Sequence, residues 1–138
     1  MYRVKVFDYT NTVAEFMSIS DLIISKPGGL TSTESLVSNL PMLMINPIPG
    51  QETENAEFLQ KNGAGILLKR NDNINLILND LLNNTEKLNT MKANCKKIAK
   101  PNSTKDICKI IFHSWWTHIR MLLSKNLYPH LAVKNPLL

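Results

Sequence analysis

Short apolar runs alternate with helical patterns through the first half of the chain. The runs "DLIIS" (21–25), "MLMIN" (42–46) and "GILLK" (65–69) are each short and apolar, as buried strands are. The stretches between them, "TSTESLVSNL" and "ETENAEFLQKN", have helical patterns, and the second ends at Gly63, a residue type suited to the left-handed turn after a helix. Strands that alternate with helices predict an α/β fold with a Rossmann-like parallel sheet.

The flanking segments extend this prediction on both sides. "RVKVF" (3–7) alternates polar and apolar residues, which predicts a strand, and "TNTVAEFMSIS" predicts a turn followed by a weak helix. After Arg70 the pattern becomes wholly helical in three stretches, "NINLILNDLLNN", "TEKLNTMKANCKKIAK" and, past Pro101, "STKDICKIIFHSWWTHIRMLLSK". We therefore expect C-terminal helices after the sheet.

The composition of the sequence indicates in which cellular compartment the protein is found. The first ten residues mix charged with apolar residues, unlike a signal peptide, and no run of about 18 apolar residues could span a membrane. Cys95 and Cys108 have no C-x-x-C spacing, so we expect free thiols rather than a disulfide or a zinc site. We expect a cytoplasmic protein, or one peripheral on the inner face of the membrane, without a nucleic acid partner.

The charge is unevenly distributed. The net charge is +5, and all eleven acidic residues lie at or before Asp106. Four basic residues follow without compensation, so the C-terminal end carries about +4 and should be attracted to anionic surfaces; they are Lys109, Arg120, Lys125 and Lys134.

The stretch "SKPGGLTSTE" (25–34) stands where the first buried strand passes into a helix. Ligands of open parallel sheets bind beyond such strand ends. Gly28 and Gly29 leave backbone N–H groups accessible, so a phosphate can approach them and the positive end of the helix, and Lys26 adds a positive charge. The same residues allow another interpretation, in which the glycines only make a turn and Thr31 and Glu34 form a capping box.

A second loop, "NPIPGQETENA" (46–56), follows the next strand in the same way. Its helix opens with Gln51, Glu52 and Asn55. Gln51 and Glu52 could hydrogen-bond sugar hydroxyls, while Glu34 of the first loop could hold a ribose diol. The alternative is that Glu52 and Glu54 only complement the helix dipole.

Together the two loops resemble a known family. The match is carried by Lys26-Pro27-Gly28-Gly29, Thr31, Glu34, Pro49-Gly50-Gln51-Glu52 and Asn55-Ala56. From about Val4 to Phe112 the chain is similar to the C-terminal, donor-binding half of family 28 glycosyltransferases, which have the GT-B fold, and most similar to diacylglycerol glucosyltransferases and monogalactosyldiacylglycerol synthases. The resemblance implies a partial nucleotide-sugar-binding domain at 1–112 and a divergent, helical, basic tail at 113–138.

The resemblance also implies roles for individual residues. Glu34 would bind the ribose of UDP, Gln51 and Glu52 would face the hexose, and the loop at Tyr9 and Thr10 would lie near the uracil. The remaining residues of the implied UDP-sugar site, with the diphosphate at Gly29 to Thr31, are Lys26, Gly28, Gly29, Leu30, Thr31 and Asn55.

The acceptor-binding N-terminal domain of the family is absent from this sequence. The family supplies its general base from that half, so we assign no catalytic residue here. His113, His118 and His130 are expected to be surface or packing residues. A helix N-terminus with Lys26 would stabilise the departing diphosphate, so we expect neither a metal nor a cofactor.

Three functions remain open. The chain is the donor half of a hexosyltransferase that transfers glucose or galactose to diacylglycerol or a related lipid, or the donor-binding subunit of a split N-acetylglucosaminyltransferase, or a noncatalytic nucleotide-binding module. Its expected partners are a UDP-hexose, a lipid acceptor, and an N-terminal acceptor domain or partner subunit. In the tail, an apolar set either forms an interfacial membrane helix or packs on the protein; the set is Trp115, Trp116, Ile119, Leu122 and Leu123.

Overall fold

The computed structural model describes the backbone of residues 4–124 and the side chains of residues 4–118. It divides into two compact units, Met1–Lys100 and Pro101–Leu138. We describe each unit by itself.

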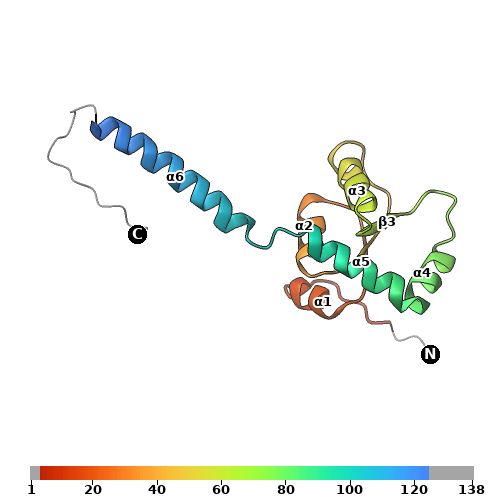
Figure 1. The fold of residues 1–138 in the computed structure, drawn as a ribbon. Coiled ribbons are helices and arrows are strands. Elements are labelled where there is room, and N and C mark those ends of the chain that lie inside the picture. Colours follow the sequence, from red (N-terminus) through yellow and green to blue (C-terminus); the bar gives the residue numbers. More distant parts are fainter. Residues whose placement is uncertain (1–3, 125–138) are drawn as a thin grey trace. The chain divides into compact units, whose positions relative to one another are not determined.

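The first unit is built on a parallel three-stranded sheet (Figure 1). Its strands are β1 (Ile23–Ser25), β2 (Met42–Met44) and β3 (Gly65–Leu67), in the spatial order β1-β2-β3. Helix α2 (Gly29–Val37) connects β1 to β2, and α3 (Gln51–Lys61) connects β2 to β3. The α/β fold with a parallel sheet is therefore confirmed, with strands shorter than the apolar runs that predicted them.

Helices complete the first unit around the sheet. α1 (Val13–Ile19) precedes β1, and α4 (Ile74–Asn83) and α5 (Thr85–Ile98) follow β3, with α5 packed against both α2 and α4 (Figure 1). The side-chain oxygen of Asn73 accepts hydrogen bonds at the start of α4, and that of Asn84 does so for α5, so each helix begins at an asparagine cap.

All three residues of β2 are fully buried, so both faces of the central strand are covered. Met42 and Met44 of β2 are fully buried and belong to one cluster with residues of α3 and α5; its other buried members are Ala56, Leu59, Ala64 and Cys95. Gly65 fits this packing because a Cβ there would stand 2.8 Å from the carbonyl oxygen of Met42. The backbone of β3 therefore approaches β2 at a point where only glycine fits.

Gly63 ends α3 as predicted. Its φ is +65°, the left-handed conformation. The N–H of Gly63 donates to the carbonyl of Gln60 (3.0 Å) and that of Ala64 to the carbonyl of Leu59 (2.9 Å). This pair of bonds is a Schellman motif, which turns the chain from α3 directly into β3.

Strand β1 has one unpaired edge. Ile23 N–H donates to the carbonyl of Pro41, and the carbonyl of Ser25 accepts from Ile45 N–H, so both residues bond toward β2. Because bonding directions alternate along a strand, the backbone groups of Ile24 point the other way, where no strand of residues 4–124 pairs with them. The side chain of Ile24 is 44% exposed.

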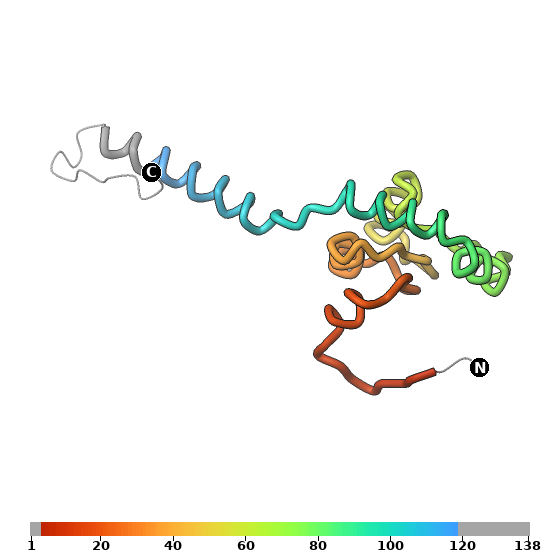
Figure 2. The backbone as a smooth tube through the Cα atoms, turned by 60° about the horizontal axis from the view of Figure 1, so that its bottom comes forward, coloured from red at the N-terminus to blue at the C-terminus, as the bar shows by residue number. Residues whose placement is uncertain are grey.

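The predicted strand at residues 3–7 is wrong for the part that the structure describes. Residues 4–7 have no regular structure, and Val4 and Val6 are more than four-fifths exposed. Figures 1 and 2 show an extended run ahead of α1 that joins no strand of the sheet. The alternating pattern suits a strand, but a strand also needs a neighbour that satisfies its backbone hydrogen bonds.

The second unit contains α6 (Ser103–Ser124). This helix confirms the helical pattern past Pro101, and it runs without interruption through Phe112 and His113. The assignment of 113–138 to a separate tail stays a prediction based on resemblance.

Candidate functional site

Two helix N-termini stand at neighbouring strand ends. α2 begins after Gly28, just beyond β1, and α3 begins after Gly50, just beyond β2. Within the described part of the chain, neither N-cap makes a side-chain capping bond. Because β1 and β2 are parallel neighbours, their carboxyl ends lie at one edge of the sheet, and two uncapped helix ends therefore share that edge.

A hydrogen bond joins the two loops. The Asn55 amide nitrogen in α3 donates to the carbonyl of Pro27, at 2.9 Å, and Pro27 is buried. Gln51 also reaches across, since a Cβ placed on Gly29 would lie 3.2 Å from the Gln51 amide nitrogen. The first turn of α3 is thus held against the start of α2, as the resemblance implied for two loops of one site.

The approach to the start of α2 is open. A Cβ placed on Gly28 would meet no described atom within 4 Å. The Lys26 side chain is exposed beside it, and Leu30 is 82% exposed. Helix geometry leaves the N–H groups of Gly29, Leu30 and Thr31 without intrahelical acceptors, so this end can accept an anion.

The alternative interpretation, a capping box of Thr31 and Glu34, is wrong. α2 begins at Gly29, two residues before Thr31, and the N–H of Ser32 already donates to the carbonyl of Gly28 at 2.8 Å. Thr31 and Glu34 are therefore the third and sixth residues of the helix, too late to cap it. The glycine pair lets the helix start early because Gly28 itself serves as the N-cap.

Glu34 lines a pocket between α1 and α2. The pocket has a volume of about 240 Å³, and its other lining residues are Ala14, Met17, Thr33, Val37 and Ser38. Sequence reasoning missed the α1 residues, because their place beside Glu34 depends on how α1 packs. Their one sequence signal is the weak helical pattern that ends before β1.

The loop before α1 contains the residues predicted to lie near the uracil. Tyr9 is 87% exposed. The hydroxyl oxygen of Thr10 accepts from the N–H of Thr12 (3.1 Å), and the two threonine hydroxyls are hydrogen-bonded at 2.8 Å. Thr10 therefore shapes the turn that leads into α1.

The residues predicted to face the hexose differ in their bonding. Gln51 is exposed beside Gly29, whereas Glu52 already has a partner in its own loop. The Glu52 carboxylate accepts from the N–H of Ile48 at 2.7 Å. This bond fixes the loop between β2 and α3, a role that sequence reasoning had not foreseen. A hydrogen bond from a sugar would use the other lone pairs of Glu52.

Ser32 is a further polar residue of this region. It is 7% exposed, and its hydroxyl oxygen has no hydrogen-bond partner among the described residues. Sequence analysis assigned no role to Ser32. Its burial on the first turns of α2 places an unused donor near the uncapped helix end.

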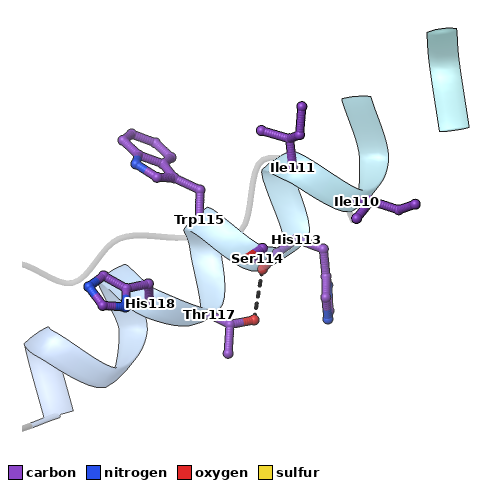
Figure 3. Close-up of a pocket in the computed structure, with 7 residues that line it drawn as sticks. All are labelled: Ile110, Ile111, His113, Ser114, Trp115, Thr117 and His118. Carbon is purple, nitrogen blue, oxygen red and sulfur yellow. Dashed lines mark hydrogen bonds between the residues drawn. The ribbon is translucent and has the colours of Figure 1, made fainter. Parts of the chain in front are cut away.

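Two other features do not form a site. In residues 4–118, no group of three or more His, Cys, Asp or Glu side chains could hold a metal ion. A depression on α6 is lined by seven described residues, but Figure 3 shows these side chains spreading around a single helix instead of converging on one space. His113 and His118 are exposed members of this set.

Comparison with known proteins identifies the family of the chain. Residues 2–109 match the model of the glycosyltransferase family 28 C-terminal domain. The chain belongs to this family, and the fold expected of the C-terminal half of a GT-B glycosyltransferase is confirmed.

Similar proteins include processive diacylglycerol beta-glucosyltransferases. That of Bacillus pumilus is 36% identical over 109 residues, covering 79% of this chain and 28% of the relative. That of Staphylococcus epidermidis is 41% identical over 106 residues, covering 77% and 27%. The crystal structure of Acinetobacter baumannii MurG superposes with a TM-score of 0.64 at 26% identity, covering 79% of this chain and 33% of that one. The chain thus spans about a third or less of these proteins.

Proposed function

We propose that this domain binds the UDP part of a UDP-hexose and serves as the donor half of a hexosyltransferase that makes glycolipid. The observation that carries the proposal is the pair of uncapped helix N-termini at one sheet edge, joined by the bond from Asn55 to Pro27. Such an edge suits a ligand with both anionic and hydroxyl groups.

The diphosphate would bind at the start of α2. The N–H groups of Gly29, Leu30 and Thr31 and the Thr31 hydroxyl would donate to its oxygens, and the open space at Gly28 allows the approach. Lys26 would add a formal positive charge. As the glycosidic bond breaks, negative charge gathers on the leaving diphosphate, and these groups would stabilise it without a metal ion.

The nucleoside would bind on the side of α1. Glu34 would accept hydrogen bonds from the two ribose hydroxyls, which a carboxylate can do with both oxygens. The apolar side chains of Ala14 and Met17 in the adjoining pocket are suited to a flat base or the sugar ring. The loop at Tyr9 and Thr10 would then lie near the uracil.

The hexose would bind toward α3, with Gln51 and Glu52 facing its hydroxyls. The names of the relatives support glucose as the sugar and diacylglycerol as the acceptor. The acceptor and the general base would come from another domain or subunit, so the 138-residue chain alone should not produce glycolipid from UDP-glucose and diacylglycerol vesicles. A donor-binding subunit of a two-chain enzyme, and a noncatalytic nucleotide-binding module, are the alternatives.

Calorimetric titration tests the donor site. UDP, ADP, UDP-glucose and UDP-galactose would each be titrated into the chain. We expect UDP to bind more tightly than ADP. Glu34→Gln should lower UDP affinity at least tenfold, since charge-assisted hydrogen bonds contribute about 1.5–3 kcal/mol each.

A matched control separates binding from stability. Glu57→Gln removes an exposed carboxylate of α3 that lies outside the proposed site, and it should leave UDP affinity unchanged. Because Glu34 does not cap α2, Glu34→Gln should also leave the thermal midpoint unchanged. Equal affinities for UDP and ADP, or equal UDP affinities of the Glu34 and Glu57 variants, would contradict the proposal.

A further inference from the structure

The segment 46–50, just ahead of α3, has a single backbone N–H within its proline-rich part. Residues 47–49 are proline, isoleucine and proline, and proline has no N–H to donate. The N–H of Ile48 donates to the carboxylate of Glu52 at 2.7 Å. The carbonyl of Ile48 accepts from the hydroxyl of Thr53 at 3.3 Å. Both backbone groups of Ile48 are therefore bound by side chains from the first turn of α3.

Polar side chains fix the path of this segment more than apolar packing does. At its two ends Asn46 has a φ of +43° and Gly50 a φ of +103°, and the first of these is sparsely populated by residues other than glycine. Such a conformation persists where the surrounding structure holds it. The side chain of Ile48 is 55% exposed, so packing of that side chain supplies little of the hold. The bonds from Ile48 to Glu52 and Thr53 remain as the main constraint.

The bond to Ile48 also orients the Glu52 carboxylate. Glu52 is the second residue of α3 and is half-buried. One of its oxygens accepts the Ile48 N–H, and the other has no hydrogen bond from a residue that the structure describes. A carboxylate has lone pairs for several donors, so it can accept a hydroxyl while the bond to Ile48 stays intact. The preceding residue, Gln51, lies beside Gly29 at the start of α2, so the free oxygen belongs to the edge shared by the two loops.

We infer that Ile48 is a positioning residue of the donor site, whose backbone N–H holds the Glu52 carboxylate ready for a hydroxyl of the hexose. The inference rests on the proposed function, because that function brings a hexose to this edge. A glutamate side chain loses rotamer freedom when it is fixed by a ligand. Because the bond to Ile48 has already removed much of that freedom, the sugar binds at a lower entropic cost.

A bond with a merely structural role would have different consequences. If it only shaped the segment 46–50, its loss would lower the thermal midpoint and would weaken the binding of UDP and of UDP-glucose alike. A positioning role affects the glucose moiety alone. The affinity for UDP-glucose divided by the affinity for UDP, which we call the glucose ratio, therefore separates the two roles.

Calorimetry on the full chain with a matched pair of variants at Ile48 tests the inference. Ile48→Pro removes the N–H, and because Ile48 precedes Pro49 the backbone there already favours an extended conformation that suits proline. Ile48→Val is the conservative variant, which keeps the N–H and has as many side-chain carbons as proline. UDP and UDP-glucose would be titrated into each protein, and circular dichroism would give the thermal midpoints.

We expect Ile48→Pro to lower the glucose ratio about three- to tenfold, the effect of losing one hydrogen bond. Ile48→Val should keep the ratio of the unchanged chain. An unchanged ratio in Ile48→Pro, or an equal fall in Ile48→Val, would overturn the inference. If the unchanged chain bound UDP no better than ADP, the proposed function would fail and the inference with it.

A second pair of variants tests whether Ile48 acts through Glu52, and this pair does not depend on how Ile48→Pro folds. Glu52→Ala should lower the glucose ratio, whereas Glu54→Ala, which removes an exposed carboxylate from the same turn, should not. Adding Ile48→Pro to Glu52→Ala should cause no further fall, because the N–H then has no carboxylate to orient. A further fall as large as in the unchanged chain, or equal ratios in Glu52→Ala and Glu54→Ala, would overturn the inference.

Discussion

The side-chain amide of Asn55 donates a hydrogen bond to the backbone carbonyl of Pro27, 28 positions earlier in the chain, at 2.9 Å. This bond joins the loop after β1 to the first turns of α3. The two helix N-termini are therefore held together by a hydrogen bond of the protein itself. A preformed arrangement of this kind lowers the entropic cost of binding a nucleotide sugar.

Replacing Asn55 by alanine should weaken both the fold and the donor site. The buried carbonyl of Pro27 would lose its partner, which should lower the free energy of unfolding by about 1 kcal/mol. UDP affinity should fall as well, because the two loops would no longer be held together. Thermal unfolding and calorimetry would measure the two effects.

Asn62→Ala is the control for this prediction. The Asn62 amide donates only to the carbonyl of Phe58 at the end of its own helix, at 2.8 Å. Asn62→Ala should therefore leave UDP affinity unchanged. If Asn55→Ala binds UDP as the unchanged chain does, the bond has no part in the site.

Gly28→Ala should affect binding and leave stability nearly unchanged. The new methyl group would meet no described atom, and the φ of Gly28, −65°, suits alanine. The methyl group would, however, occupy the space through which a phosphate approaches the start of α2. Calorimetry with UDP should therefore show a loss of affinity, while the thermal midpoint moves little. An unchanged affinity would place the diphosphate elsewhere.

Gly65→Ala should have the opposite effect. The added Cβ would stand 2.8 Å from the carbonyl oxygen of Met42 and 3.0 Å from the Met44 methyl carbon. Since backbone atoms of β2 cannot move without disturbing the sheet, we expect a loss of about 1–3 kcal/mol in the free energy of unfolding. Denaturant titration would measure it. A variant as stable as the unchanged chain would show that β3 can shift away from β2.

The β-α-β order could be predicted from the sequence because its signals are local: short apolar runs separated by helical patterns. The sequence could not predict the fate of residues 4–7, because strand formation there depends on a neighbour far along the chain. The capping box failed for a different reason. Gly28 allows α2 to start before Thr31, and the Thr-Ser-Thr-Glu pattern alone gives no sign of this earlier start.

The candidate site shows the same division. Both loops could be recognised from their glycines and polar residues, whereas the pocket at Glu34 depends on how α1 packs on α2. The hydrogen bond from the Ile48 N–H to the Glu52 carboxylate likewise depends on the path of the loop between β2 and α3, which contains two prolines, Pro47 and Pro49.

The buried thiol of Cys95 predicts a loss of stability in alkali. Burial raises the pKa of Cys95 from 9.0 to about 11, while its S–H contacts the carbonyl of Ala64. The folded chain thus holds this proton more tightly than the unfolded chain does. The contribution of the protonated Cys95 thiol to the free energy of unfolding is therefore complete below about pH 9 and is lost as the pH rises to about 11.

Denaturant midpoints of the unchanged chain and of Cys95→Ala, measured at several values between pH 8 and pH 11, would test this. Lysine and tyrosine residues titrate in both proteins, so the difference between them reports Cys95. The variant should be less stable at pH 8, because it leaves a cavity, and should lose less on going to pH 11. Parallel curves would mean that the thiol titrates normally in the folded state.

The unpaired edge of β1 affects how this polypeptide behaves as a laboratory sample. The backbone groups of Ile24 that face away from β2 can form hydrogen bonds with an extended segment of another molecule. The exposed side chain of Ile24 adds an apolar contact next to them. Concentrated stocks should therefore grow turbid with time, at a rate that climbs steeply with protein concentration. A lysine in place of Ile24 should slow this clouding and lengthen the useful life of the stock.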